Sequence, residues 1–353
     1  MLAARLYGAK DLRIEEMPEP EPGPGPGEVK IRVAYAGICG TDVHEYFEKP
    51  RATHEPNPLT GATLPQTLGH EFAGTVVVCG EGVDRVAPGA RVCVRPIRTC
   101  GMCPRCTSGL SHLCTALAAI GVTAPGGGLA QYVRVPADSV HLLPDGLSLE
   151  QGALVEPMAV ALNAVERACV PGGGSALVTG AGAVGMGALF ALKAYGVHDV
   201  LMVEPSPTRR AAAELHGARV LDPGAVDVVE EVMIHTRGRG VDAAIECSGR
   251  PEALNAALCS VAARAPVVMV ALYSGPVAID AAALRLAELA LLGSEAYPDG
   301  AFERVIEYMA AGHYPIDGWL DRIPLGDTVK GLHDVRDGRR VKVLVEIPAD
   351  SAA

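Results

Sequence analysis

Residues 179–189, TGAGAVGMGAL, decide the fold of this chain. Gly180, Gly182 and Gly185 stand in the order G-x-G-x-x-G, after the apolar run SALVTG and before an Ala/Leu-rich segment of helical length. The first glycine permits a tight turn, the second lets the backbone approach a pyrophosphate, and the third allows a helix to pack closely on a strand. Ala183 and Val184 then open a helix whose N-terminus attracts the anion. We expect these five residues to bind a dinucleotide.

An acidic residue further along supports this reading. Glu204 ends the next apolar run, 19 residues after Gly185, where an acid holds the ribose 2′-hydroxyl in dinucleotide-binding folds. A carboxylate repels a 2′-phosphate, so NAD is favoured over NADP. Arg209 and Arg210 lie close enough in sequence to weaken that preference, and we include Arg209 among the candidate cofactor-binding residues. The alternative is that both arginines are solvated residues of the following helix. The alternative for the glycines is a flavodoxin-like turn without a ligand.

The segments around the glycine loop predict the fold class. From about residue 175, short apolar runs alternate with segments of helical length, which predicts βαβ units and a doubly wound parallel sheet. The first 150 residues instead hold short β-branched runs bounded by Gly and Pro, at 29–38, 72–79, 91–95 and 131–135. We therefore expect an α/β protein with a β-rich domain and a nucleotide-binding domain.

The C-terminal part determines the expected domain boundaries. Residues 301–314 read as a helix ending near Gly312, and VKVLVEIP, residues 341–348, reads as a last strand. This tail is too short to fold alone, so we expect it to return to the β-rich domain. The prediction is a discontinuous domain of residues 1–155 and 296–353, with the dinucleotide-binding domain over 156–295.

Composition excludes several classes of protein. The 353 residues carry a formal net charge of −11, and no Lys/Arg cluster supplies the basic surface that nucleic-acid binding needs. The N-terminus lacks the apolar core of a signal peptide, and no stretch reaches about 18 uninterrupted apolar residues. We expect a soluble, cytoplasmic protein with neither nucleic-acid nor membrane partners. Ten cysteines are too few for a secreted disulfide scaffold of this length.

Four of the cysteines form a candidate metal site. They follow the pattern C-x2-C-x2-C-x7-C, which comprises Cys100, Cys103, Cys106 and Cys114. The two-residue spacing lets a tight loop direct successive sulfurs to one ion, and tetrahedral Zn²⁺ takes four thiolates at about 2.3 Å. Four protein ligands leave no position for a substrate, so the predicted site is structural. Unligated or oxidised thiols are the alternative.

Three other segments carry polar residues that folding of a β-rich domain does not need. The segments are GICGTDVHEY, LGHEFAG and ALVEPMAVAL. Their polar residues are Cys39, Thr41, Asp42, His44, His70, Glu71 and Glu156. Taken singly, each has an ordinary explanation: a core thiol, a hydrogen-bonded turn histidine, or an acid near a helix N-terminus.

Taken together, the motifs resemble the zinc-dependent medium-chain alcohol and polyol dehydrogenases over almost the whole chain. In order and spacing, the resemblance rests on GICGTD with His44, GHEFAG, the four-cysteine loop, GGGLAQYVRVP at 126–136, LVEP at 154–157, the glycine loop and Glu204. It implies a GroES-like catalytic domain and a Rossmann coenzyme domain.

The resemblance also implies a catalytic zinc. Cys39 and His70 would bind it, with a carboxylate ligand from Glu71, Glu156 or both in alternation. Three protein ligands leave one position open, where zinc lowers the pKa of a bound hydroxyl. Alcohol oxidation by hydride transfer to the nicotinamide can then proceed near neutral pH.

Three further roles follow from the same resemblance. Thr41 would hydrogen-bond the substrate hydroxyl, and His44 would form the outer end of a proton relay through the cofactor ribose. Asp42 would orient His70.

The substrate expectation is narrower. The 30 residues between Cys39 and His70 resemble those of 2,3-butanediol (acetoin) dehydrogenases, although some of those enzymes lack the four-cysteine loop. The sequence CGTDVHEY is also close to the threonine dehydrogenase pattern. We expect an NAD-dependent secondary alcohol or vicinal-diol dehydrogenase. The alternative is a sorbitol-, threonine- or biosynthetic-pathway-specific enzyme of the same family. A remote alternative is a non-catalytic protein that binds zinc and a dinucleotide. The resemblance implies a homo-oligomer, a tetramer or otherwise a dimer.

Overall fold

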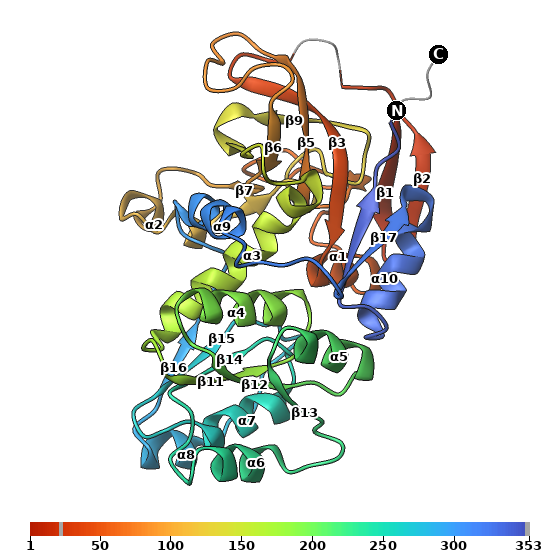
Figure 1. Ribbon diagram of the computed structural model, residues 1–353. Helices are drawn as coiled ribbons and strands as arrows, with labels where there is room; N and C mark the ends of the chain where they lie inside the picture. The colour runs from red at the N-terminus through yellow and green to blue at the C-terminus, as the bar shows by residue number, and fades with distance from the viewer. Residues whose placement is uncertain (21–23, 350–353) are drawn as a thin grey trace. The chain divides into compact units, whose positions relative to one another are not determined.

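The computed structural model describes residues 1–20 and 24–349, and the chain divides into two compact units (Figure 1). Unit 1 contains Met1–Glu156, Pro298–Ala310 and the segment from Leu320 onward, and unit 2 contains Pro157–Tyr297 and Ala311–Trp319. The expected division assigned 296–297 and 311–319 to the β-rich domain, whereas both segments belong to unit 2. The longer segment, 311–319, carries most of the difference. Aromatic packing provides a physical reason, because the ring centroids of Tyr314 and Trp319 lie 5.8 and 5.7 Å from that of Phe190.

Unit 2 is built on one parallel sheet, as the alternation of apolar runs and helical segments predicted. Its strands, in the spatial order β13-β12-β11-β14-β15-β16, are all paired in parallel. Their bounds are β11 (Ser175–Thr179), β12 (Asp199–Val203), β13 (Arg219–Leu221), β14 (Ala243–Glu246), β15 (Pro266–Met269) and β16 (Ala290–Gly293). The strand order reverses between β11 and β14, and such a switch point is where open α/β sheets bind ligands, outside the carboxyl ends of the strands.

Helices connect these strands. They are α4 (Ala183–Ala194), α5 (Pro207–Leu215), α6 (Val228–His235), α7 (Pro251–Ser260) and α8 (Ala281–Leu286), preceded by α3 (Leu149–Ala168), which begins in unit 1. Polar side chains cap the N-termini of three of these helices. Ser206, Asp227 and Asp280 accept hydrogen bonds from backbone N–H groups in the first turns of α5, α6 and α8, respectively.

Unit 1 is mostly β structure. Its largest sheet runs in the order β10-β6-β5-β3-β18-β17, with β9 paired to β3, beside a sheet β2-β1-β4 and a pair β7-β8. The strands are β1 (Leu2–Gly8), β2 (Asp11–Glu16), β3 (Glu28–Ile38), β4 (Gln66–Thr67), β5 (Glu71–Cys79), β6 (Arg91–Val94), β7 (Ile97–Arg98), β8 (Ala118–Ala119), β9 (Tyr132–Pro136), β10 (Val140–Leu142), β17 (Leu320–Pro324) and β18 (Lys342–Glu346). Its helices are α1 (Gly40–Phe47), α2 (Pro104–Thr107), α9 (Ala301–Ala310) and α10 (Thr328–Arg336).

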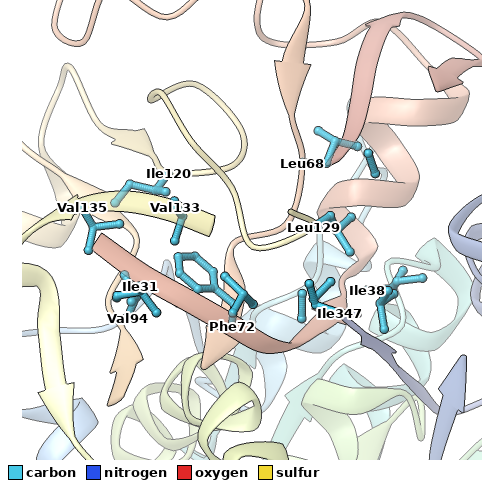
Figure 2. Packing of buried hydrophobic residues seen from close by; sticks show 14 of the residues in the cluster. Ile31, Ile38, Leu68, Phe72, Val94, Ile120, Leu129, Val133, Val135 and Ile347 are labelled. Atoms are coloured by element: carbon cyan, nitrogen blue, oxygen red, sulfur yellow. The ribbon is translucent and has the colours of Figure 1, made fainter. Parts of the chain in front are cut away.

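The core of unit 1 lies on its large sheet. Figure 2 shows part of this cluster, with Phe72 of β5 among branched side chains such as Ile31 of β3 and Val133 of β9, all three at most 1% exposed. β-branched residues suit a pleated, buried surface. Truncating a buried phenylalanine such as Phe72 to alanine costs about 3–5 kcal/mol, so this packing stabilises the strand that begins at the candidate site. Among the described residues, no helix combines the length and apolarity that a membrane crossing requires.

Candidate functional site

The pairing of β3 with β5 brings the first candidate ligands together. Gly37 near the end of β3 lies opposite Glu71 at the start of β5 in the antiparallel register. Cys39, which follows β3 and caps α1, and His70, which precedes β5, are therefore neighbours although 30 residues separate them in sequence. Ligand atoms of Cys39, His70 and Glu71 all lie within 4.8 Å of one another.

The Asp42 carboxylate lies beside one ring nitrogen of the histidine. Its Oδ2 accepts a hydrogen bond from the backbone N–H of Cys39 at 2.9 Å, and its Oδ1 lies 3.6 Å from Nδ1 of His70. Because Nδ1 faces Asp42, Nε2 is the ring nitrogen left for a metal. A carboxylate behind a ligating histidine is a common arrangement in metal sites, since it fixes the ring and its tautomer.

The donor set fits a divalent cation. Burial raises the pKa of the Cys39 thiol, and the charge of Glu71 raises it further, so a thiolate here needs a nearby positive charge. Burial alone would lower the pKa of His70, but Cys39 and Asp42 raise it well above its usual value. Glu71 Oε1 is buried and has no hydrogen-bond partner among the described residues, so this oxygen is open to a metal. A buried thiol, imidazole and carboxylate are the ligand types that zinc takes.

One residue at this site escaped the sequence reasoning. Lys342 of β18 is about 1% exposed, pairs with Glu71 Oε2, and donates a hydrogen bond to the carbonyl of Ile38 at 3.0 Å. Burial lowers the pKa of Lys342, but Glu71 outweighs that effect, so the pKa is raised overall. The available signal was a lysine in the otherwise apolar run VKVLV, which requires a buried counter-ion.

The other carboxylate candidate is placed differently. Glu156 is buried on α3 and is not part of the 4.8 Å group formed by Cys39, His70 and Glu71. The structure thus brings together three of the four catalytic-zinc candidates.

Thr41 and His44 lie on α1, the helix that Cys39 caps. Thr41 is half-buried in the first turn. His44 is also partly buried, with 35% of its side chain exposed, and its Nδ1 lies 3.1 Å from the Glu48 carboxylate one helical turn further on. Both residues therefore share one rigid element with Cys39, as a relay would need.

The four-cysteine loop forms a second compact group. Sulfur–sulfur distances are 3.5 Å for Cys103–Cys106, 3.9 Å for Cys103–Cys114 and 3.5 Å for Cys100–Cys114. A tetrahedron of sulfurs about 2.3 Å from zinc has edges of about 3.8 Å, so the group has the dimensions of a zinc site. Backbone N–H groups lower the pKa of Cys103 to about 5, which favours the thiolate that binds metal. The described cysteines form no disulfide.

In unit 2, the predicted dinucleotide residues lie at the carboxyl ends of β11 and β12. Gly182 caps α4, and a Cβ added there would meet no atom within 4 Å, so the space before the helix is open. A Cβ on Gly185 would lie 1.9 Å from the carbonyl oxygen of Gly180, so only glycine fits there. Ala183 and Val184 form the first turn of α4. This is a cradle suited to a pyrophosphate.

Glu204 is 3% exposed and adjoins the glycine loop. Its Oε2 accepts from the N–H of Ala181 and its Oε1 from the N–H of Ser206, both at 2.8 Å. Arg210 donates to the carbonyls of Glu204 and Pro205 at 3.2 and 2.6 Å and also pairs with Asp222 at 2.9 Å.

Arg209 differs from Arg210. Its backbone N–H donates to the Ser206 cap. Burial lowers the pKa of its guanidinium, and Glu204 opposes that change. The Arg209 guanidinium therefore lies within the electrostatic reach of Glu204. The Arg210 guanidinium is bound to the carbonyls of Glu204 and Pro205 and to Asp222.

Known families match both units. Residues 25–145 match the alcohol dehydrogenase GroES-like domain, and residues 183–311 match the zinc-binding dehydrogenase domain. The chain is 38% identical over 350 residues to (R,R)-butanediol dehydrogenase of Bacillus subtilis (98% of this chain, 99% of the relative). It is 35% identical over 353 residues to 2-dehydro-3-deoxy-L-galactonate 5-dehydrogenase of Pseudoalteromonas atlantica (99% and 100%).

Solved structures agree with these matches. The crystal structure of 2R,3R-butanediol dehydrogenase from Bacillus subtilis matches with a TM-score of 0.90 and 39% identity, covering 99% of each chain. A zinc-binding dehydrogenase from Sinorhizobium meliloti, described as putative and bound to NADP, matches with a TM-score of 0.87 and 32% identity, covering 98% of each chain.

Proposed function

Because the chain belongs to the zinc-dependent medium-chain alcohol dehydrogenase family, and is thus an NAD(P)-dependent oxidoreductase acting on CH–OH groups, we propose that it oxidises a small vicinal diol or secondary alcohol with NAD. The observation that carries the proposal is the group Cys39, His70 and Glu71 in one unit, combined with a glycine cradle and Glu204 in the other. The overall reaction converts a secondary alcohol and NAD⁺ into a ketone, NADH and a proton.

Two zinc ions fit the residues present. Cys100, Cys103, Cys106 and Cys114 would hold the structural ion. Cys39 and His70, with a carboxylate from Glu71 or Glu156, would hold the catalytic one. When bound in a site with one open position, zinc supplies Lewis acidity that lowers the pKa of the substrate hydroxyl.

The chain's own residues perform the remaining work. Asp42 holds His70 in one orientation through its Nδ1 face. Thr41 would accept a hydrogen bond from the substrate hydroxyl and relay its proton through the cofactor ribose to His44, each group giving up one proton as it takes one, so that hydride can leave the carbinol carbon for the nicotinamide. Helix α1 keeps both groups in a fixed relation to Cys39, which reduces the entropy cost of aligning them.

Glu204 supports NAD over NADP. Two backbone N–H groups hold its carboxylate in place, where it would accept hydrogen bonds from a ribose diol and repel a 2′-phosphate. Arg210 is already paired with Asp222 and two carbonyls, whereas Arg209 lies within the electrostatic reach of Glu204 and is the cation that could weaken this preference. The Sinorhizobium meliloti structure with NADP makes cofactor preference a necessary measurement.

The butanediol relative supports 2,3-butanediol or acetoin as the substrate pair. A second candidate, a hydroxyl group of a sugar acid, is favoured by the comparable likeness to the galactonate-derivative dehydrogenase. Sorbitol and threonine remain the alternatives that the sequence motifs left open. Both candidates would use the same zinc and cofactor residues, so only the substrate distinguishes them.

The test follows NADH formation by zinc-loaded enzyme on separate 2,3-butanediol stereoisomers, with sorbitol, threonine and simple secondary alcohols in parallel. Turnover confined to one or two butanediol isomers is the expected result. Turnover only on another member of the panel would keep the reaction class and refute the substrate. Absence of NADH and NADPH formation on every compound by zinc-containing protein would refute the proposal.

The proposal extends to a homo-oligomer, a tetramer or otherwise a dimer, in the cytoplasm, where the thiols of the four-cysteine site stay reduced. Light scattering coupled to size-exclusion chromatography measures the assembly directly, and a monomeric mass would contradict it.

A further inference from the structure

A buried carboxylate that the proposed chemistry does not use lies at the end of β14. Glu246 is 0% exposed. Its Oε1 accepts hydrogen bonds from Ser248 N at 2.7 Å, Ser248 Oγ at 2.5 Å, Gly249 N at 3.0 Å and Thr179 Oγ1 at 3.3 Å. Its Oε2 accepts from Tyr273 OH at 2.6 Å. A carboxylate offers acceptors only, and here five donors converge on it.

These donors come from three segments of unit 2. Thr179 immediately precedes the glycine loop, residues 247–249 follow β14, and Tyr273 lies in the segment after β15. The segments are in close contact, since a Cβ added to Gly249 would lie 2.6 Å from the carbonyl oxygen of Leu272. Backbone bonds from Val270 and Ala271 to the carbonyl of Glu246, at 3.0 and 3.2 Å, add to the attachment.

All three segments stand at the carboxyl ends of parallel strands, on both sides of the switch point between β11 and β14. A doubly wound sheet binds one half of a dinucleotide on each side of such a point. Glu204, at the end of β12, marks the side of the adenosine ribose. The ends of β14 and β15 therefore face the nicotinamide half.

We propose that Glu246 and Tyr273 are positioning residues for the nicotinamide half of the cofactor, which fix the segment after β15 against the glycine loop. The proposal rests on dinucleotide binding by unit 2. Burial and the bond to Glu246 raise the pKa of Tyr273, so the phenol remains a donor at neutral pH. Without that bond, the segment loses its side-chain attachment, while the adenosine side, held by Glu204 and Ala181, is unchanged.

The experiment compares NADH with ADP-ribose, which lacks only the nicotinamide. Calorimetric titration of wild-type enzyme and Tyr273→Phe with both ligands separates the two halves of the site. We expect Tyr273→Phe to weaken NADH binding about tenfold, in keeping with loss of one charge-assisted hydrogen bond, and to leave ADP-ribose binding within about twofold. Glu246→Gln should show the same selectivity.

Tyr195→Phe is the matched control, because the Tyr195 hydroxyl donates to another carboxylate of unit 2, Glu166, at 2.9 Å and Tyr195 caps the far end of α4. It should leave both affinities unchanged. Equal weakening of NADH and ADP-ribose by Tyr273→Phe, or no change in either, would overturn the inference. If wild-type enzyme bound neither ligand, dinucleotide binding itself would fail, which is a distinct result.

Discussion

Replacing Lys342 with methionine tests its buried ion pair with Glu71, a contact that the sequence did not predict. Lys342 and Glu71 are each 1% exposed in their side chains, so Lys342→Met leaves a carboxylate buried without its cation. Removing one partner of a buried pair costs about 3–5 kcal/mol. At roughly 2–4 °C per kcal/mol for a domain of this size, the unfolding temperature should fall by about 6–20 °C.

Scanning calorimetry with the catalytic zinc removed from every protein measures this change, because zinc bound to Glu71 would itself compensate the carboxylate. Lys330→Met is the control, because Lys330 is 62% exposed and pairs with Asp334 at 3.3 Å within one helix; such surface pairs contribute below about 1 kcal/mol. Removing both buried charges in Lys342→Met/Glu71→Gln should restore much of the loss. If the free energy of unfolding of Lys342→Met lay within about 1 kcal/mol of the wild-type value, the inference that Lys342 compensates the buried charge of Glu71 would be refuted.

Three further outcomes are expected. Cys39→Ser should lose one zinc per chain and nearly all turnover while keeping its circular dichroism spectrum; full turnover in metal-free buffer would exclude Cys39 as a ligand. Cys103→Ser should also lose one zinc but mainly lower the unfolding temperature, and an unchanged temperature would argue against a structural ion. Glu204→Ala should reduce the kcat/KM ratio of NAD to NADP by about tenfold or more, in keeping with loss of charge-assisted hydrogen bonds; an unchanged ratio would remove its ribose role.

Local pattern was sufficient for much of the fold. The glycine loop lies between β11 and α4 as its order of residues required, and the β-branched run at 29–38 corresponds to β3 (Glu28–Ile38). Periodicity and turn residues act over short distances, so a single sequence displays them. The parallel pairing of β17 with β18 is a long-range choice that no local pattern displays.

For the same reason, Lys342 and Glu246 were not predicted, because their partners are distant in sequence. Lys342 and Glu71 lie 271 positions apart, and the pairing of β3 with both β18 and β5 brings them together. Glu246 stood in the run AIECSG, where its partner Tyr273 is 27 positions away. The candidate ligands Cys39 and His70 were identified through the family resemblance that their motifs carry, whereas a counter-ion or a positioning carboxylate belongs to no such motif.

NADH absorbance most directly tests whether this protein is a zinc-dependent dehydrogenase with Cys39 as a zinc ligand. Wild-type enzyme and Cys39→Ser would be incubated with NAD and each 2,3-butanediol isomer, with zinc content measured on the same samples. We expect NADH formation by wild-type protein holding two zinc ions and almost none by the variant holding one. Equal rates from the two proteins, or wild-type protein inactive on this diol and on every other alcohol tried with both zinc ions bound, would contradict it.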